Sequence, residues 1–203
     1  MGRKAIQRTR KELTPKVKSW VKALVPLLQD KQLNHLTLDD LAALANKSKS
    51  TIYTYFSTKE EIYQTAVKLV LDDLQYAASP NAVAGDDMKL SLQNLLQKIS
   101  EGIGAISLSF LEQLKKHFKQ AWQLVEHFAA KVLANLALIY KKGMCEGTFK
   151  TYNIELLTAL DSHFVMNIMT NTAIFNQQGI TFNGLVKEYL ELRLNALLIL
   201  PKG

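Results

Sequence analysis

Residues 37–62 read TLDDLAALANKSKSTIYTYFSTKEEI, and this stretch decides how the chain is expected to fold. Thr37 precedes an apolar-periodic segment and is followed three residues later by Asp40, a pattern typical of a capped helix N-terminus. A turn at Asn46 and Lys47 follows, and a second short segment of helical periodicity comes directly after it. Asparagine tolerates the positive φ that such a tight turn demands better than other non-glycine residues. Two short helices joined in this way predict a helix-turn-helix.

The second of these helices, residues 48–55, divides into an inward and an outward face. Ile52 and Phe56 are four residues apart and are expected to point inward, together with the rest of the apolar pattern. An α-helix fits the major groove of DNA, where hydroxyls and lysines contact phosphate oxygens and base edges. The outward set that could make such contacts is Ser48, Lys49, Ser50, Thr51, Tyr53, Thr54 and Tyr55. Ordinary core packing is the alternative explanation for its aromatic members.

A third helix is predicted to begin after Thr58, because Thr58 and Glu61 are spaced as a capping box. Lys59 lies at its first turn, where free backbone N–H groups and the positive end of the helix dipole favour a phosphate. Thr37 and Lys47, at the start of the first helix and in its turn, complete the candidate contacts to nucleic acid.

Residues 38–62 resemble the signature of the TetR family of bacterial repressors. That signature has an Ala-Gly-Val-Ser turn, a Thr-Leu-Tyr-x-Tyr/His-Phe recognition segment, and then Ser-Lys-Glu. The resemblance implies that Thr51, Tyr53, Tyr55 and Lys59 contact DNA, largely through phosphates. It covers about 30 residues, and the remainder of the chain matches the family only in its layout of helices.

The turn departs from the family pattern at two positions. Asn46 replaces the glycine, which is a mild change, and Lys47 replaces an apolar residue. A lysine cannot fill the same small core site, so either the turn is looser or Lys47 reaches a phosphate. A small-molecule-binding helical protein with a degenerate helix-turn-helix is therefore an alternative, which Lys47 alone favours.

Charge is distributed unevenly along the chain. Residues 1–70 contain 13 Lys and Arg against 6 Asp and Glu, whereas residues 71–203 contain 12 of each, so the first third accounts for the net charge of +7. This asymmetry favours contact between that third and a polyanion, although a solubilising basic face and an anionic membrane surface remain alternatives. Basic residues near the N-terminus form either a DNA-binding arm or a solubilising tail: Arg3, Lys4, Arg8, Arg10 and Lys11.

Apolar periodicity is helical throughout, and the chain holds only 9 Gly and 4 Pro, so we expect an all-α protein of about nine helices. Beyond the motif, helices are predicted at residues 15–30, 88–102, 107–119, 122–145, 154–177 and 182–199. Residues 77–87, AASPNAVAGDD, read as a linker. We predict a helix-turn-helix DNA-binding domain over residues 1–62 and a helical body over residues 63–203.

The resemblance implies that the body holds a ligand pocket and a dimer interface. The candidate pocket residues are its larger aromatic and soft side chains, although core packing explains most of them equally well: Phe110, His117, Phe118, Trp122, Phe128, His163, Phe164, Met166 and Met169. The last two predicted helices would pair with their copies in a homodimer. Residues 162–186 contain no charged side chain, which favours a buried protein–protein interface.

No chemistry of catalysis or metal binding is visible in the sequence. The four histidines show no metal-ligand spacing with each other or with Cys145, and no phosphate-binding glycine loop is present. We therefore expect no enzyme and no cofactor. The lone Cys145 excludes an internal disulfide, is typical of a reducing cytoplasm, and is more often a buried inert thiol than a redox sensor. Residues 162–186 are too polar to cross a membrane.

The sequence thus predicts a cytoplasmic, ligand-responsive transcriptional regulator. As a repressor, it would bind a near-palindromic operator as a dimer, with its two recognition helices about 34–36 Å apart. A small molecule in the body would release it. Repression is the habit of the resembled family, and an activator of the same family is the alternative.

Overall fold

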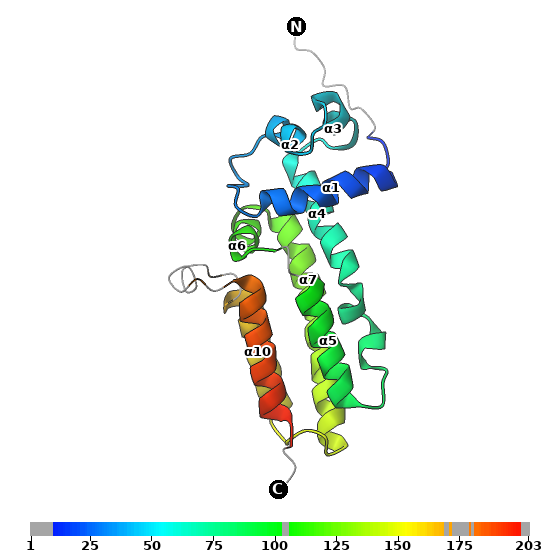
Figure 1. Ribbon diagram of the computed structural model, residues 1–203, viewed down its shortest axis with the longest axis vertical. Helices are drawn as coiled ribbons and strands as arrows, with labels where there is room; N and C mark the ends of the chain where they lie inside the picture. Colours follow the sequence, from blue (N-terminus) through cyan, green and yellow to red (C-terminus); the bar gives the residue numbers. More distant parts are fainter. Residues whose placement is uncertain (1–9, 103–105, 169–170, 172–178, 180, 200–203) are drawn as a thin grey trace.

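The computed structural model shows an all-α protein, as the sequence predicted. It describes residues 10–102, 106–168, 171, 179 and 181–199. Within these residues there are nine α-helices, and the extended pairing is limited to an isolated bridge between Phe149 and Leu198. No helix in these ranges is both long and apolar enough to span a bilayer. Figure 1 shows an elongated molecule with α2 (Leu38–Leu44) and α3 (Lys49–Tyr55) at one end and the last turns of α10 (Phe182–Leu197) toward the other.

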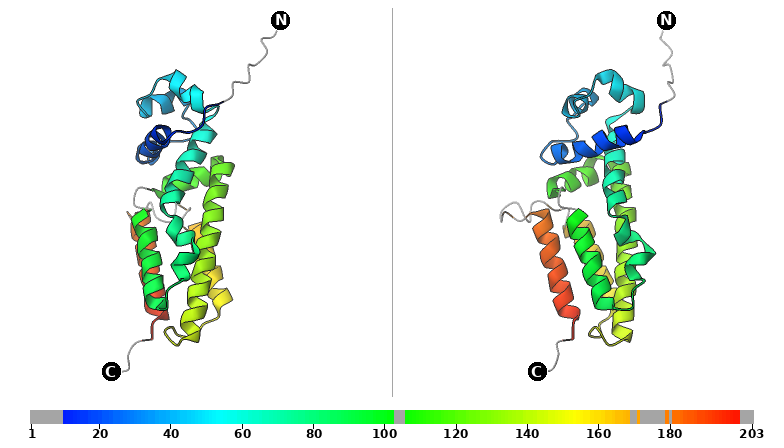
Figure 2. Two further views of the ribbon diagram at one scale, coloured as in Figure 1. Left: turned by 90° about the vertical axis from the view of Figure 1, so that its right-hand side faces the viewer. Right: turned by 45° about the vertical axis from the view of Figure 1, so that its right-hand side comes forward.

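Four helices form the N-terminal end of the molecule: α1 Pro15–Leu28, α2 Leu38–Leu44, α3 Lys49–Tyr55 and α4 Lys59–Asp73. The Thr14 side chain caps α1 by accepting a hydrogen bond from the Val17 N–H at 3.3 Å. Helix α1 runs across α4 and packs against it, while α2 and α3 lie beyond α1 at the tip (Figures 1 and 2). We call α2 and α3 the tip, and α1 and α4 connect it to the rest of the molecule.

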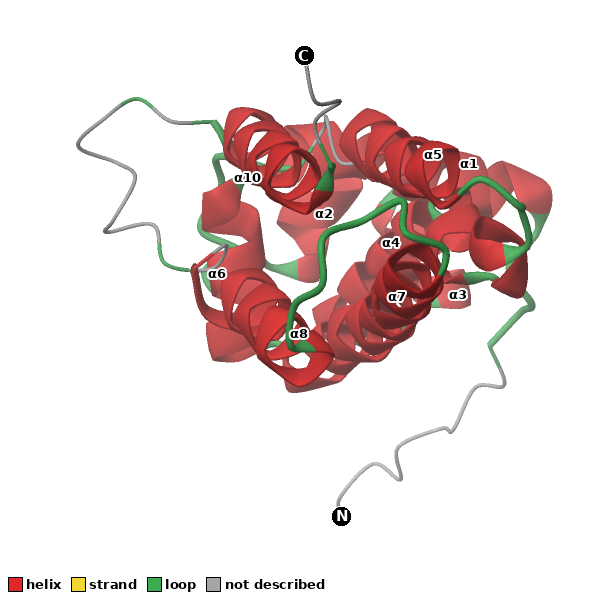
Figure 3. Ribbon diagram, turned by 90° about the horizontal axis from the view of Figure 1, so that it is seen from below, coloured by secondary structure: helices red, strands yellow, loops and turns green. Residues whose placement is uncertain are grey.

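The body contains the remaining helices: α5 Met88–Gly102, α6 Leu108–His117, α7 Lys119–Cys145, α8 Ile154–His163 with a π-helical turn Phe164–Ile168, and α10 Phe182–Leu197. Seen end-on in Figure 3, α5 and α10 lie side by side, with α7 and α8 opposite them. Helix α7 begins three residues before the predicted start. The predicted helix over residues 154–177 holds as far as residue 168, and most of the stretch beyond lies outside the described residues.

Helix α4 connects the tip to the body without a break. One buried cluster includes Val21 of α1, Ile62 of α4, Leu114 of α6 and Val186 of α10, so the core is shared between the two regions. The predicted division after residue 62 falls inside α4, four residues from its start. The division into two domains stays a prediction.

The predicted linker is wrong for most of residues 77–87. Two 3-10 helices, η1 Gln75–Ala78 and η2 Pro80–Val83, lie in this region and pack on α5 and α7. The Asn135 amide of α7 donates hydrogen bonds to the carbonyls of Ala77 and Ser79, both at 2.9 Å. The small side chains of this segment allow it to approach α7 closely. Small residues are also typical of flexible linkers, so composition alone could not distinguish a packed segment from a linker.

Candidate nucleic-acid interface and internal cavity

The turn between α2 and α3 is closed by the backbone, as a helix-turn-helix requires. Asn46 has a φ of 51°, the one positive φ among the described non-glycine residues. The Lys47 N–H donates to the Ala42 carbonyl at 2.9 Å, and the Asn46 N–H donates to the Ala43 carbonyl at 3.0 Å. Lys47 is half-buried, yet these hydrogen bonds are made. The expected role of Asn46 is confirmed, and the turn does not loosen around Lys47.

The predicted capping box at the start of α2 is present in both halves. The Asp40 N–H donates to the Thr37 hydroxyl at 3.1 Å, and the Thr37 N–H donates to the Asp40 carboxylate at 2.8 Å. The backbone hydrogen bond from Thr37, followed by that from its hydroxyl, lowers the pKa of Asp40. Because the Thr37 hydroxyl already donates to Asp40 at 2.7 Å, this residue has a local structural role, and its contact to DNA stays a prediction.

Helix α3 presents a polar face to solvent and an apolar face to the core. Ile52 and Phe56 are 0% and 2% exposed, and the Phe56 ring meets Trp20 of α1 edge-on, with centroids 5.8 Å apart. The predicted inward residues are therefore confirmed. On the other face the exposed hydroxyl of Ser48 accepts a hydrogen bond from the Thr51 N–H and lies 2.9 Å from the hydroxyl of Ser50.

The aromatic side chains of α3 differ in their exposure. Tyr53 is 43% exposed and lies on the polar face. Tyr55 is half-buried and packs against the shared core, so ordinary packing accounts for part of its side chain. The Thr54 hydroxyl donates to the Ser50 carbonyl at 2.8 Å, within the helix. Tyr53 is thus the aromatic residue of α3 best placed to meet a ligand from outside.

Lys49 forms an ion pair across the motif that the sequence analysis missed. Its ammonium donates to the Asp39 carboxylate of α2, and this hydrogen bond raises the pKa of Lys49. The other carboxylate oxygen of Asp39 is buried and has no hydrogen-bond partner among the described residues. The pair links the two helices of the motif and places one acid beside its basic surface.

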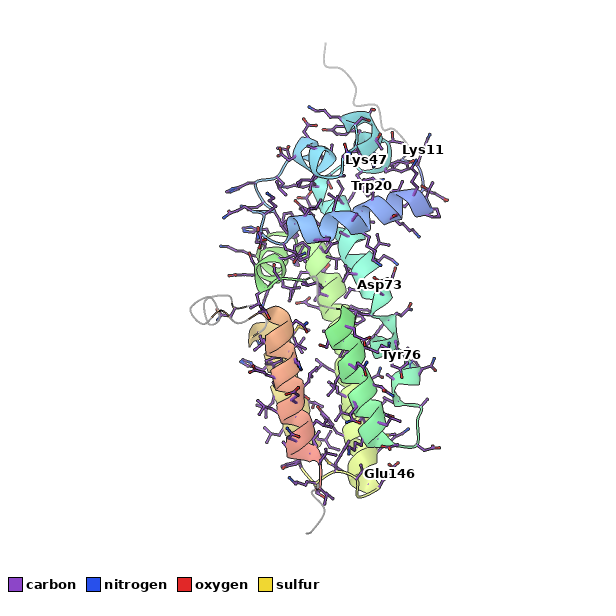
Figure 4. All side chains as sticks on the ribbon, viewed as in Figure 1. Lys11, Trp20, Lys47, Asp73, Tyr76 and Glu146 are labelled. Carbon is purple, nitrogen blue, oxygen red and sulfur yellow. The ribbon has the colours of Figure 1, made fainter. Side chains whose placement is uncertain are left out.

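Arg10 and Lys11 attach the start of the described chain to the end of α3. The Arg10 guanidinium donates to the Ser57 hydroxyl at 2.8 Å and to the Tyr53 carbonyl, and the Lys11 N–H donates to the Thr54 carbonyl at 3.2 Å. Figure 4 shows Lys11 and Lys47 at the same end of the molecule. The other candidate arm residues, Arg3, Lys4 and Arg8, lie outside the described residues.

Lys59 is turned toward the protein, contrary to its expected contact with a phosphate. Its ammonium donates to the carbonyls of Asn34 at 2.6 Å, Leu36 at 3.0 Å and Leu33 at 3.4 Å. It also lies 5.8 Å from the centre of the Phe118 ring. An ammonium has three donors, and all three are directed at the α1–α2 connection. Lys59 therefore clamps that connection to α4, which argues against the expected phosphate contact.

A cavity of about 150 Å³ lies inside the body, enclosed by residues of α1, α4, α5, α6, α7, α8 and α10. Most of its described lining is aliphatic, such as Val70 of α4 and Leu133 of α7, and the polar members are Asp161 and Tyr189. Mostly apolar enclosures with few polar groups are typical of small-molecule sites. The cavity is the part of the body that could take an apolar ligand.

Only some of the predicted pocket residues line this cavity. Phe110, Phe128 and Phe164 contribute to its wall. His117 and His163 are exposed, and Met166 is half-buried against the core without being part of the described lining. Met169 lies outside the described residues.

Phe118 and Trp122 are buried at other places in the fold. The Phe118 ring packs on Tyr63 at 4.7 Å between centroids, and the Trp122 indole N–H donates to Glu126 at 2.7 Å. Aromatic side chains occur in the core as well as at pockets, so residue type could not separate the two locations. His117, Phe118, Trp122, His163 and Met166 do not line this cavity, and their assignment to a ligand pocket stays a prediction.

A buried polar network at one wall of the cavity was not predicted. The Asp161 carboxylate of α8 accepts hydrogen bonds from the Tyr140 hydroxyl of α7 at 2.8 Å, from the Tyr189 hydroxyl, and from Arg193 Nε at 2.7 Å. The side chains of Asp161 and Arg193 are 2% and 15% exposed. Burial is the largest cause raising the pKa of Tyr140, followed by the Asp161 charge. The sequence signal that could have indicated this network is Asp161, an acidic residue among the apolar residues of α8.

The described residues contain no group of three or more His, Cys, Asp or Glu side chains that could hold a metal ion. Cys145 is exposed, so the expectation of a buried thiol is wrong. Its position at the last residue of α7 explains the exposure, because the chain turns there at the far end of the body.

Comparison with known proteins gives a match in the helix-turn-helix region. Residues 21–66 match the family model of bacterial regulatory proteins of the tetR family. The chain is also similar to the uncharacterized HTH-type transcriptional regulator YvaF of Bacillus subtilis, with 27% identity over 99 residues. That alignment covers 45% of this chain and 49% of YvaF, which is about half the length of each protein.

Solved structures of transcriptional regulators, among them the TetR family member PfmR, share the fold over most of the chain. PfmR from Thermus thermophilus has a TM-score of 0.64 at 20% identity, covering 87% of this chain and 97% of its own. KstR2 of Mycobacterium tuberculosis, a ketosteroid transcriptional regulator, has a TM-score of 0.65 at 17% identity, covering 95% and 100%. FadR from Bacillus subtilis, solved in complex with stearoyl-CoA, has a TM-score of 0.58 at 18% identity, covering 87% and 97%. At these identities the likeness shows a common fold.

Proposed function

We propose that this chain is a repressor of the TetR type that binds an operator as a homodimer and leaves it when a small molecule occupies the body, a proposal that the family match over residues 21–66 supports. The observation that carries the proposal is the polar face of α3. Tyr53, Lys49 and the exposed hydroxyls lie together on this face, while Ile52 and Phe56 fix the helix from behind. Such a face fits the major groove, where phosphates position the helix and base edges give sequence preference.

The closed turn supports DNA binding over the degenerate alternative. Asn46 takes the left-handed conformation and the turn keeps its backbone hydrogen bonds, so Lys47 has not disrupted the motif. The amide and side chain of Lys47 remain at the DNA-facing end of the molecule (Figure 4). A charge excess confined to residues 1–70 also favours a polyanion at this end.

Exposed leucines on the last two helices support a homodimer. Leu156 and Leu160 of α8 are 59% and 49% exposed, and Leu192 of α10 is 69% exposed. These side chains would be buried if the helices paired with their copies, as in a four-helix interface. The dimer would then carry two copies of α3 for two half-sites of an operator.

Hydrogen bonds from α6 offer a route between the cavity and the DNA-binding end. Gln113 of α6 accepts from the Leu33 N–H at 2.6 Å and donates to the Lys31 carbonyl at 2.7 Å. The neighbouring residues Leu111 and Leu114 line the cavity. A ligand that shifts α6 would therefore pull on the α1–α2 connection, to which Lys59 is also clamped.

Such release requires a difference in binding between two states. A ligand shifts the protein away from DNA only if it binds the released conformation better than the operator-bound one. FadR from Bacillus subtilis, solved in complex with stearoyl-CoA, is a regulator of the same fold that binds a ligand with an acyl chain. In this proposal the ligand of this chain binds in the cavity lined by Phe110 and Phe128.

Selection from a random duplex pool tests the operator. Repeated enrichment on the full-length protein should yield two half-sites whose centres are about 10 base pairs, or a multiple of that distance, apart. Mass photometry of the selected duplex should show two, or a multiple of two, protomers bound. Enrichment of no common sequence, or of a single half-site bound by one protomer, would overturn the proposed dimeric operator complex.

A further inference from the structure

A groove of about 290 Å³ opens on the surface between α5 and α10, next to the internal cavity. Leu190 is the one residue that lines both spaces among the described lining residues. It is half-buried and packs against both clusters of the core. The two spaces are therefore separated at this point by a leucine side chain, which can change rotamer without breaking a hydrogen bond.

The inner space offers no net charge to a ligand. The one charged residue in its described lining, Asp161, is paired with Arg193 and accepts two tyrosine hydroxyls. Residues 103–105 and 169–180, which lie outside or largely outside the described chain, contain no charged residue in the sequence. An ionised group placed here would lose its hydration without gaining a partner, which is costly. The cavity suits an uncharged apolar chain.

The groove carries charged and uncharged polar side chains over a mostly apolar wall, and its charges are already paired. Lys187 and Glu191 form an ion pair at 4.0 Å along α10, and Lys98 and Glu101 form another at 3.3 Å along α5. Glu101 also accepts a hydrogen bond from the Gln97 amide at 2.8 Å. An anionic or cationic group in the groove would meet neighbours of both signs, so neither sign is favoured.

Uncharged hydrogen-bonding groups also line the same groove. Gln93, Gln97 and Ser100 of α5 line it, and the Ser100 hydroxyl donates to the Asn183 side chain of α10 at 3.0 Å, linking the two helices. Amides and hydroxyls both donate and accept, so they can hold a hydroxyl-bearing head group. The groove thus complements a neutral polar head.

We propose that the ligand of this protein is a single-chain amphiphile with an uncharged, hydroxyl-bearing head, which enters between α5 and α10 past Leu190. The tail occupies the cavity and the head lies in the groove. The inference rests on the proposed function, since this ligand would be the effector that releases the operator. It differs from an acyl-CoA, whose multiple negative charges would find no unpaired cation in the described lining.

Three probes with the same ten-carbon tail isolate the effect of head-group charge: decan-1-ol, decanoate and decylammonium, titrated at pH 7 by calorimetry below their aggregation limits. Decan-1-ol should bind at least tenfold more tightly than either ion. Equal or tighter binding of decanoate or decylammonium would overturn the neutral head, and absence of decan-1-ol binding would overturn the whole inference.

Substitutions of Leu190 test the route of entry. Leu190→Trp should reduce the affinity for decan-1-ol at least tenfold, whereas Leu90→Trp, at a 52% exposed leucine of α5 outside both spaces, should leave it unchanged. Leu190→Ala, which removes bulk instead of adding it, should raise the association rate at least threefold in stopped-flow. Unchanged affinity in folded Leu190→Trp, or an unchanged association rate in Leu190→Ala, would refute entry at this point.

The same preparations should be assayed for binding to the selected operator without any amphiphile. Operator binding with no decan-1-ol binding would refute this inference and leave the proposed function standing. Decan-1-ol binding with no operator binding would refute the proposed function and leave the assigned ligand class standing.

Discussion

The helix-turn-helix and the body of this protein are specified in different ways. In residues 37–62 the decisive contacts join near neighbours, such as the reciprocal bonds of Thr37 and Asp40. In the body the contacts that shape the cavity join distant residues, such as Asp161 with Tyr140 and Arg193, which are 21 and 32 positions away. The structure of the first region can therefore be predicted from a short stretch of sequence. The contacts of the second region can be identified only from the three-dimensional structure.

The same difference predicts how each region responds to substitution. Exposed polar residues of α3 should affect DNA binding strongly and folding weakly, because Ile52 and Phe56 hold the helix from the other side. Substitution of buried polar residues in the body should lower the free energy of unfolding strongly, because their partners would be left buried without a hydrogen bond to protein or water. The predictions that follow test this contrast.

The largest effect is expected at the buried network of the body. Asp161→Ala removes the acceptor of two tyrosine hydroxyls and leaves Arg193 unpaired at 15% exposure, so it should lower the free energy of unfolding by about 3–5 kcal/mol. Urea denaturation followed by circular dichroism measures the change. Glu191→Ala, which breaks the exposed pair with Lys187, should cost less than about 1 kcal/mol. Equal losses in the two variants would contradict the role given to the network.

The next effect belongs to the tip. Tyr53→Phe removes a hydroxyl expected to hold a phosphate, and a hydrogen bond to a charged group contributes about 1.5–3 kcal/mol, so operator affinity should fall at least tenfold. Fluorescence anisotropy on the selected duplex measures the loss. The matched control is Tyr76→Phe, at a 40% exposed tyrosine of η1, which should leave affinity and stability unchanged. A normal affinity in Tyr53→Phe would remove this residue from the interface.

The sequence predicted the tip well and the site in the body poorly, for physical reasons. Thr37, Asn46, Ile52 and Phe56 have roles set by local geometry, and the structure confirms each of them. The contacts of Lys59 were not predicted, because its partners are carbonyls more than 20 positions earlier, which no local pattern marks.

The lining of the cavity was predicted only in part, for a related reason. Its wall is mostly aliphatic, as in Val70 and Leu133, whereas aromatic type led the prediction to Phe118 and Trp122 in the core elsewhere. A leucine at helical spacing has the same pattern whether it faces another leucine or an empty space. The helices themselves were predictable because their caps and periodicity are local.

A third prediction joins the two regions. Gln113→Ala removes both hydrogen bonds from α6 to the α1–α2 connection, so operator binding should persist while release by the ligand weakens about tenfold. Anisotropy of the preformed complex, titrated with decan-1-ol, measures the release. Gln123→Ala, at an exposed glutamine of α7, serves as the control. Full release in Gln113→Ala would show that coupling runs by another route.

The smallest effect concerns alkaline pH. Burial raises the pKa of Tyr63 and of Tyr140, so above pH 10 the unfolded chain loses phenolic protons that the folded protein keeps. Because the unfolded state then binds fewer protons, the free energy of unfolding should fall by roughly 1.4 kcal/mol per pH unit for each of these tyrosines. Urea denaturation between pH 9 and pH 11 tests this, with Tyr140→Phe expected to reduce the slope. A stability that does not change above pH 10 would contradict their buried, neutral state.

The most direct test of the central claim is an anisotropy titration of the full-length protein against its selected duplex, with unrelated competitor DNA and increasing salt. The account predicts tight binding that survives competitor, at two protomers per operator, with a log affinity that falls linearly with log salt by roughly 0.9 for each phosphate contacted. Binding that is equal for every duplex and abolished by competitor would contradict a sequence-specific regulator and leave the tip without its proposed role.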